Sequence, residues 1–506
     1  KAAKLLARGM IIFMIAMATT KGLGYLYKVI ITRWVATAEF GLFSLGLAFF
    51  TLISGVVVTG INLTLGKQVA FYRGEKNNEQ SRSIIINGIS LILGLSIIIG
   101  AILFLSANTI AAYMSKPGLG VVLKIFAIAF PFYNLFLSAQ KILEGFQRID
   151  LSVWGNIILT ITKTIFVIIA IAVGGRTSGI TFSFAAATAV SAFMLFFICE
   201  KAAAHIFSSA KRPINKIREL CTLSWPLTIA LMAHIIMTWG DTIVLGFFRT
   251  IEEVGIYNIV LPTANLLTLP IITAETVFLP LVTQMIARQE QGEVMKLYKI
   301  ATRWIFLIIL PMFIMLMLFP AKILGTIAGD EFSVGSVALM IIATAMVILS
   351  LAAPANMILL SINKTKLMMK NSIIAVLISI LLNILLIPKL GLTGAAMAFL
   401  AVSIVILLLR TGEIILATKS HPLSLKMMNI ILAGVIAAIA TYSGDRILGP
   451  HIHYGLISLI SNAMILLVFY GGMLYLVGGL GEEEKEVIRA IKRKAGLGKI
   501  NEQTLE

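Results

Sequence analysis

Long apolar stretches alternate with short polar breaks along the whole chain. An uncharged run of 18 or more residues is long enough to cross a bilayer as a helix, because a helix satisfies its own backbone polar groups. The pattern therefore predicts an all-α integral membrane protein with fourteen transmembrane helices. We place these spans at residues 7–33, 40–71, 83–107, 118–141, 151–173, 178–200, 221–248, 256–287, 300–320, 334–361, 368–388, 391–414, 424–444 and 454–478.

Two of the polar breaks carry nearly the same five residues, EFGLF at 39–43 and EVGIY at 253–257. The loop RTSGIT at 176–181 matches GLTGAA at 391–396 at nearly the same offset. Glycine in a turn explains each short match by itself, but it does not explain the shared offset. We interpret the pattern as a duplication of six spans. Because six is even, the two copies are predicted to be parallel repeats with a substrate site between them.

The repeats divide the chain into four predicted parts. Residues 1–210 form an N-terminal six-helix bundle and residues 211–418 form a C-terminal six-helix bundle. Residues 419–480 add a pair of transmembrane helices, the thirteenth and fourteenth, and residues 481–506 form a cytoplasmic tail.

Composition and charge support the membrane assignment. Hydrophobic residues make up 59% of the 506 residues, mean hydropathy is +0.99 and 13% of residues are charged. A soluble enzyme of this composition could not cover its surface with polar groups. With the N-terminus in the cytoplasm, most of the 41 Lys and Arg fall on cytoplasmic segments, which predicts a plasma-membrane protein with both termini cytoplasmic. The net charge of +18 is thus a topology signal, and no nucleic-acid partner is expected.

Ionisable residues inside the predicted spans mark candidate functional sites, because a charge in the apolar layer is costly unless it has a partner or a wet cavity. Five such lysines lie in the first half, and two acids lie in the second. They are Lys21, Lys28, Lys67, Lys124 and Lys163, and Asp241 and Glu275. We interpret Lys21, Lys28, Lys163 and Lys67 as a cationic cavity wall that binds phosphate. The alternative is that Lys67 and Lys124 snorkel to the interface and that the others make structural pairs.

Asp241 and Glu275 fit either pairing with these lysines or binding of a coupling proton or Na⁺. His234 lies seven residues before Asp241, so contact between them is sterically allowed, although a packed histidine is the simpler explanation.

The eighth span contains Pro262, Pro270 and Pro280, which favour kinks. A bend there could gate the transporter or could be static.

The layout of six, six and two spans resembles the polysaccharide-transport (O-antigen flippase) family of the MOP exporter superfamily. The resemblance covers about residues 1–418. It rests on RWVATAEFGLFSLGLAFF (33–50), KILEGFQRIDLSVWGNII (141–158), SWPLTIALMAHIIMTWGDTIVLGFF (224–248) with EEVGIYNIV (252–260), and KLGLTGAAMAF (389–399). The layout is also similar to that of lipid II flippases, but the first span is not rich in arginine, as would be expected of them.

This resemblance implies a secondary transporter that moves a polyprenyl-(di)phosphate-linked oligosaccharide from the inner to the outer leaflet. Alternating access between the two bundles is the implied mechanism. Expected partners are this substrate, membrane lipids and separate glycosyltransferases. A non-enzymatic monomer without cofactor or metal is expected, because no phosphate-binding Gly–Lys loop or spaced Cys/His cluster is found. The alternatives are a multidrug exporter of the same superfamily, whose cavity should be acidic, and a membrane-embedded enzyme, which should have large external loops.

Overall fold

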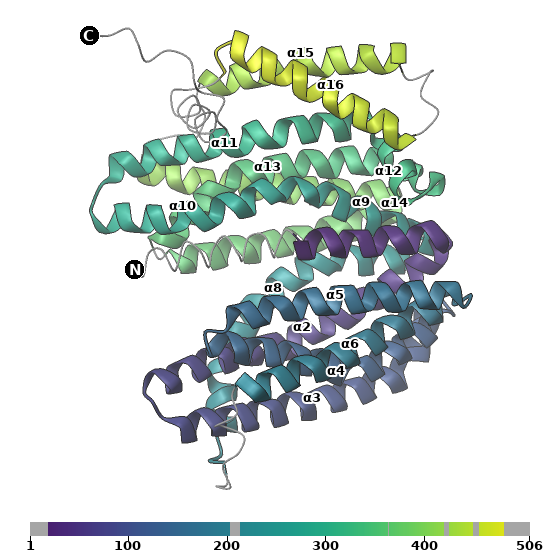
Figure 1. Cartoon of the computed structure of the whole chain (residues 1–506), viewed down its shortest axis with the longest axis vertical. Coiled ribbons are helices and arrows are strands. Elements are labelled where there is room, and N and C mark those ends of the chain that lie inside the picture. The colour runs from purple at the N-terminus through teal and green to yellow at the C-terminus, as the bar shows by residue number, and fades with distance from the viewer. Residues whose placement is uncertain (1–18, 203–212, 363, 419–424, 449–454, 480–506) are drawn as a thin grey trace, which may run out of the picture.

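The computed structural model describes residues 19–202, 213–362, 364–418, 425–448 and 455–479 (Figure 1). These residues form helices and turns, and none of them lies in a strand. After a helix at residues 19–34, the helices are α2 (Thr37–Gly74), α3 (Asn78–Tyr113), α4 (Leu119–Gly145), α5 (Ile149–Ala172), α6 (Thr177–Ala202), α8 (Ile217–Phe248), α9 (Ile251–Asn265), η1 (Leu266–Thr268), α10 (Leu269–Ala287), α11 (Gln291–Leu318), α12 (Pro320–Ala328), η2 (Asp330–Gly335), α13 (Ser336–Ser361), α14 (Thr365–Thr418), α15 (Leu425–Leu448) and α16 (Gly455–Leu476).

Among the described residues, twelve helices are long and apolar enough to cross a membrane, which confirms the predicted all-α membrane protein. The helix α14 counts once here, although it contains the predicted spans 368–388 and 391–414. Much of the predicted first span, 7–33, lies outside the described residues. The number fourteen therefore stays a prediction. The predicted tail at 481–506 also lies outside the described residues.

The helix α14 changes direction at Gly391, where the sequence predicts a loop. Gly391 has φ 55°, a left-handed conformation that suits glycine. The Glu253 carboxylate accepts a hydrogen bond from the Leu392 backbone N–H at 2.8 Å and another from Arg249 Nε at 3.0 Å. This carboxylate replaces the helical acceptor that the kink removes, so a single residue makes the reversal between the two spans.

A second predicted loop is also helical. Residues 321–333 lie between the predicted spans 300–320 and 334–361, but most of them are helical and belong to α12 and η2. Pro320 stands at the first position of α12, where its fixed φ favours a helix start. Ile323 and Leu324 are buried, and this packing stabilises a helix too short to persist alone.

Figure 1 shows two groups of helices, with α2–α6 in one and α9–α14 in the other. We call the helix at 19–34 with α2–α6 the first bundle, and α8–α14 the second bundle. The helix α8 packs against both α2 and α14, so it connects the bundles. The pair α15 and α16 packs on α11, on the side of the second bundle away from the first (Figure 1).

The helices of both bundles end in the same type of turn. Lys76 follows α2 and Gln289 follows α10, and both adopt left-handed φ values near 60° (57° and 60°). The next residue, Asn77 or Glu290, donates its backbone N–H to a carbonyl five residues earlier. This is the arrangement of a Schellman helix end. The same turn also follows α3 at Ser115 and α4 at Gln147, so it is a general way in which helices of this protein end, and the duplication stays a prediction.

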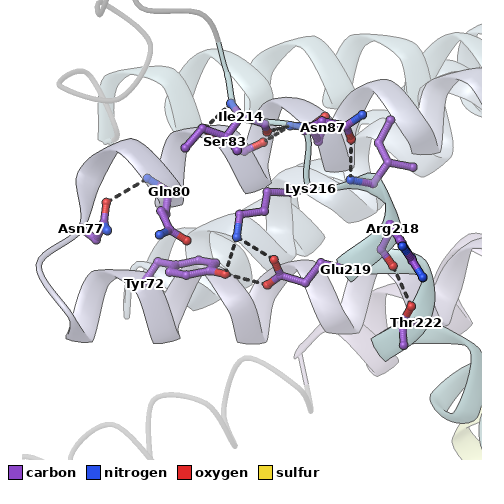
Figure 2. Close-up of polar contacts among 12 residues, drawn as sticks. Tyr72, Asn77, Gln80, Ser83, Asn87, Ile214, Lys216, Arg218, Glu219 and Thr222 are labelled. Atoms are coloured by element: carbon purple, nitrogen blue, oxygen red, sulfur yellow. Dashed lines mark hydrogen bonds and ion pairs between the residues drawn. The ribbon is translucent and has the colours of Figure 1, made fainter.

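The segment that joins the bundles is held against the first bundle (Figure 2). Lys216 Nζ donates to Glu219 Oε2 at 2.7 Å and to Tyr72 Oη at 3.1 Å, and Tyr72 Oη donates to Glu219 Oε1 at 2.6 Å. The Asn87 side chain donates to the Ile214 carbonyl at 2.7 Å. These contacts fix the start of α8 on α2 and α3, at the end of the molecule that the charge distribution predicts to be cytoplasmic.

Glu219→Gln is expected to destabilise this anchor at neutral pH by about 1 kcal/mol. Burial raises the pKa of Glu219, but the hydrogen bonds and charge of Lys216 and the Tyr72 bond outweigh it, so the pKa lies below the ordinary 4.5. A lowered pKa contributes stability above pH 4.5 that is lost as the pH falls through the folded-state pKa. The thermal-stability difference between wild type and Glu219→Gln should therefore shrink below pH 4.5.

The exposed pair of Lys296 and Glu293 provides the control, because Glu293→Gln should cost little at any pH. A wild-type advantage over Glu219→Gln that stayed constant down to pH 3 would contradict this account of the anchor.

Candidate substrate site between the two bundles

The repeated segments EFGLF and EVGIY contact each other between the bundles. A Cβ added to Gly41 would lie 2.0 Å from the Ile251 carbonyl oxygen, and one added to Gly255 would lie 2.5 Å from the Thr37 carbonyl oxygen. Only glycine permits so close a backbone approach. The two similar segments from which we predicted a duplication therefore also form a contact between the bundles.

Other contacts join the bundles at the same end. Thr37 Oγ1 donates to Glu331 Oε2 at 2.5 Å, and Arg33 Nε donates to the Ile327 carbonyl at 2.9 Å. The rings of Phe40 and Phe332 meet edge to face at 6.4 Å between centroids. We call the Gly41–Gly255 packing and the Thr37–Glu331 bond the outer contact, since this end is predicted to be external. It closes the space between the bundles there.

Two of the predicted lysines lie together just inside the outer contact. Lys28 Nζ donates to the Asn258 carbonyl of α9 at 3.3 Å. Lys163 Nζ, from α5, lies 5.1 Å from the centroid of the Tyr27 ring. Lys163 is close enough to Lys28 for the two charges to repel. In the described part of the chain, no carboxylate lies within ion-pair distance of either lysine. We call Lys28 and Lys163 the lysine pair.

Lys21 belongs to a second group of charges across the same space. The Glu275 carboxylate on α10 attracts both Lys21 and Arg410 of α14. Arg410 is also attracted by the Glu413 carboxylate, which accepts a hydrogen bond from the Asn371 side chain at 3.0 Å. The acid thus offsets Lys21, whereas the lysine pair stays uncompensated.

Lys67 does not join the other lysines. It lies thirty residues into α2, about 45 Å along the helix axis from the outer end, and its side chain is exposed. The structure therefore brings Lys28 and Lys163 together, places Lys21 opposite an acid and leaves Lys67 apart. This arrangement favours the interfacial interpretation of Lys67.

Asp241 is buried inside the second bundle, away from lysines. Its Oδ2 accepts from Tyr257 Oη at 2.9 Å, and its Oδ1 accepts from Asn383 Nδ2 at 2.5 Å. Asn258 lies beside them and donates to Thr242 Oγ1 at 3.3 Å. The sequence-based pairing of Asp241 with a lysine is therefore not seen; hydroxyl and amide groups surround the carboxylate instead.

His234 and the three prolines are placed as follows. The His234 side chain is exposed, and the Asp241 carboxylate is bonded to Tyr257 and Asn383 instead, so His234 and Asp241 do not form a relay in the described structure. Pro262 lies inside α9, Pro270 opens α10 and Pro280 lies inside α10. The eighth span is broken by the 3₁₀ turn η1 between Pro262 and Pro270. The α-helix is thus interrupted between these two prolines, and a role of the prolines in gating stays a prediction.

Sequence analysis missed several polar partners at this site. Arg410 is a lone arginine within predicted span 391–414, which is a signal that could have identified it. Tyr257, Asn258 and Asn383 carry no comparable signal, because uncharged polar residues are common in membrane helices. Their importance becomes visible only when the fold places Asn383 against Asp241, 142 positions away.

The fold is shared with known membrane transporters. The lipid II flippase MurJ in an inward closed conformation aligns over 92% of this chain and 99% of its own, with a TM-score of 0.72 and 17% identity. An inward-facing multidrug resistance MATE family transporter of the MOP superfamily covers 77% of this chain and 92% of its own, with a TM-score of 0.65 and 14% identity. The chain therefore has the fold of a MOP-superfamily transporter.

Sequence comparison narrows this class to one family. Residues 6–286 match the family described as "Polysaccharide biosynthesis protein", and residues 226–385 match the MatE family. Because the first match spans more than half of the chain, the protein belongs to the polysaccharide biosynthesis protein family. A probable low-salt glycan biosynthesis flippase, Agl15 of Haloferax volcanii, is 28% identical over 195 residues, which is 38% of this chain and 41% of that relative's length.

Proposed function

We propose that this protein is a flippase that moves a polyprenyl-(di)phosphate-linked oligosaccharide from the cytoplasmic to the outer leaflet of the plasma membrane. Membership of the family and the flippase among its relatives support the general activity. The observation that carries the substrate class is the lysine pair, because it is an uncompensated cationic site between the bundles.

A lipid-linked diphosphate carries the negative charge that would neutralise the lysine pair. Lys28 uses one of its ammonium donors on Asn258, so further donors remain for a phosphate oxygen. Phosphate would relieve the repulsion between Lys28 and Lys163 and would replace the hydration lost inside the membrane. The sugar then crosses in the space between the bundles, while the polyprenyl chain stays in lipid.

The outer contact determines from which side of the membrane a substrate can reach the lysine pair. With Gly41 packed on Gly255, the outer end is closed, so substrate reaches the lysine pair from the cytoplasmic leaflet. Release to the outer leaflet requires the outer contact to separate. We therefore propose alternating access between this closed arrangement and a second one in which the outer contact is separated, with α8 as the helix that contacts both bundles.

Transport of two substrate classes tests this proposal. Proteoliposomes that contain the purified chain should transfer a fluorescent polyprenyl-diphosphate oligosaccharide between leaflets and should not accumulate organic-cation dyes. A cationic drug would be repelled by the lysine pair. Dye transport without lipid transfer would replace the proposal with a multidrug exporter.

We further infer that Asp241 carries the coupling cation, a proton or Na⁺. It is a buried carboxylate with oxygen-bearing neighbours, and Asn383 Oδ1 has no hydrogen-bond partner in the described structure. Glu275 is less suited to this role, because Lys21 and Arg410 already offset its charge.

Asp241→Asn is expected to lower gradient-driven transfer roughly tenfold while leaving substrate binding intact. The substitution keeps the shape of the side chain and removes the charge that binds a cation. Transfer would be measured under imposed H⁺ and Na⁺ gradients, with exposed Asp330→Asn as the matched control. If Asp241→Asn kept the wild-type response to both gradients, its coupling role would be excluded.

A further inference from the structure

A groove lies between α3 and α4 of the first bundle. It holds about 410 Å³ and is lined by apolar side chains that include Phe104, Leu105 and Ile128. Leu105 is 80% exposed and Ile128 is 60% exposed. Figure 1 shows α3 at the edge of the first bundle that lies away from α9–α14, and neither residue of the lysine pair lines the groove. The groove is therefore separate from the proposed transport site.

Small residues and a proline shape the floor of this groove. A Cβ added to Gly100 of α3 would lie 2.9 Å from the Ala127 carbonyl oxygen of α4, so the backbones approach closely there. Pro131 has no N–H to donate to that carbonyl, which removes one helical hydrogen bond. The floor of the groove therefore consists of backbone and small side chains, and the larger apolar side chains form its walls.

One cation stands at the end of the groove. The half-buried Lys124 places Nζ 5.8 Å from the centroid of the Phe104 ring, which lines the groove. Lys124 lies five residues into α4, about 8 Å from its outer end, within snorkelling reach of the headgroup region. Lys124 makes no ion pair with the residues that the structure describes. The apolar groove thus ends at an ammonium without a carboxylate partner.

We propose that this groove is a binding site for one anionic phospholipid of the outer leaflet. The phosphate pairs with Lys124, and one hydrocarbon chain lies between α3 and α4 along Phe104 and Leu105. The charge argues for a lipid, because an unpaired ammonium at this depth needs an anion and the bilayer supplies phosphate there. The apolar walls argue for a hydrocarbon chain, because the residues that line the groove are apolar and several of them are exposed at its surface.

Lipid binding to the purified full-length chain tests this site independently of transport. Native mass spectrometry would count retained phosphatidylglycerol and compare its apparent affinity with that of zwitterionic phosphatidylcholine. We expect the wild type to prefer phosphatidylglycerol, and Lys124→Gln to bind it roughly tenfold more weakly. Ala101→Phe, which places a large ring in the groove from an exposed position, should weaken both lipids.

Lys116→Gln is the matched control, since it removes the same charge near the same end of the helix pair but outside the groove. It should leave phosphatidylglycerol affinity within twofold of wild type. If Lys116→Gln and Lys124→Gln lost equal amounts of phosphatidylglycerol affinity, the effect would come from general surface charge, and the proposed lipid site would be wrong. A dimer that Ala101→Phe dissociates, without a change in lipid affinity, would show instead that a second copy covers this face.

Discussion

Replacing Lys28 with glutamine is expected to weaken binding of a polyprenyl-diphosphate oligosaccharide roughly 30-fold. A hydrogen bond to a charged group contributes about 2 kcal/mol, which corresponds to a factor of roughly 30 in affinity. Lys28 is central because it bridges the helix at 19–34 and α9 while its charge stays uncompensated. Binding would be measured on purified protein by the displacement of a fluorescent lipid-linked substrate.

Substitutions of the other lysines show whether the loss of binding is specific to the lysine pair. Lys163→Gln should cause a similar loss, because it removes the second half of the lysine pair. Lys67→Gln should stay within about twofold of wild type, because its exposed side chain lies far along α2. Equal losses at Lys28 and Lys67 would mean that overall charge, and not this site, governs binding.

Gly41→Ala is expected to open the outer contact. The new methyl group would lie 2.0 Å from the Ile251 carbonyl oxygen, an overlap that closed bundles cannot relieve without moving apart. Overpacking of this kind costs about 1–3 kcal/mol, which shifts a two-state equilibrium by roughly 5- to 150-fold. The protein should therefore populate outward-open states that are rare in the wild type.

Spin labels at Val173→Cys and Val334→Cys would report this change by their distance distribution. Both sites are exposed near the outer ends of the first and second bundles, and the native Cys199 and Cys221 would be replaced first. Gly94→Ala is the matched control, because nothing lies within 4 Å of the added methyl group. A folded Gly41→Ala protein with the wild-type distance distribution would show that the glycine contact does not set the state of the gate.

The hydrophobic pattern predicted most of the fold because membrane helices must satisfy their backbone internally, which makes long apolar runs a strong signal. The hydrophobic pattern was less informative where a single residue with positive φ connects two spans without a loop. Gly391 reverses α14 in a single position because Glu253 binds the following N–H, and that carboxylate lies 139 positions from Leu392. No local pattern indicates such a long-range bond.

The candidate site was predictable in its charges and not in its geometry. Lys28 and Lys163 stood out because ionisable residues are rare inside apolar runs. Their proximity depends on packing between the helix at 19–34 and α5, which spacing cannot reveal. Equally, EFGLF and EVGIY indicated that the two halves are equivalent, but equivalence does not imply that Gly41 and Gly255 should meet.

The most direct test of the central claim is leaflet transfer of a labelled polyprenyl-diphosphate oligosaccharide in proteoliposomes, comparing wild type with the double variant Lys28→Gln/Lys163→Gln. We predict rapid transfer by the wild type and a loss of at least tenfold in the folded double variant, since the headgroup then has no cationic partner between the bundles. Wild-type transfer that the double variant matches would contradict the assignment of the lysine pair as the phosphate site. Absence of transfer by the wild type with mono- and diphosphate-linked substrates alike would contradict the flippase itself.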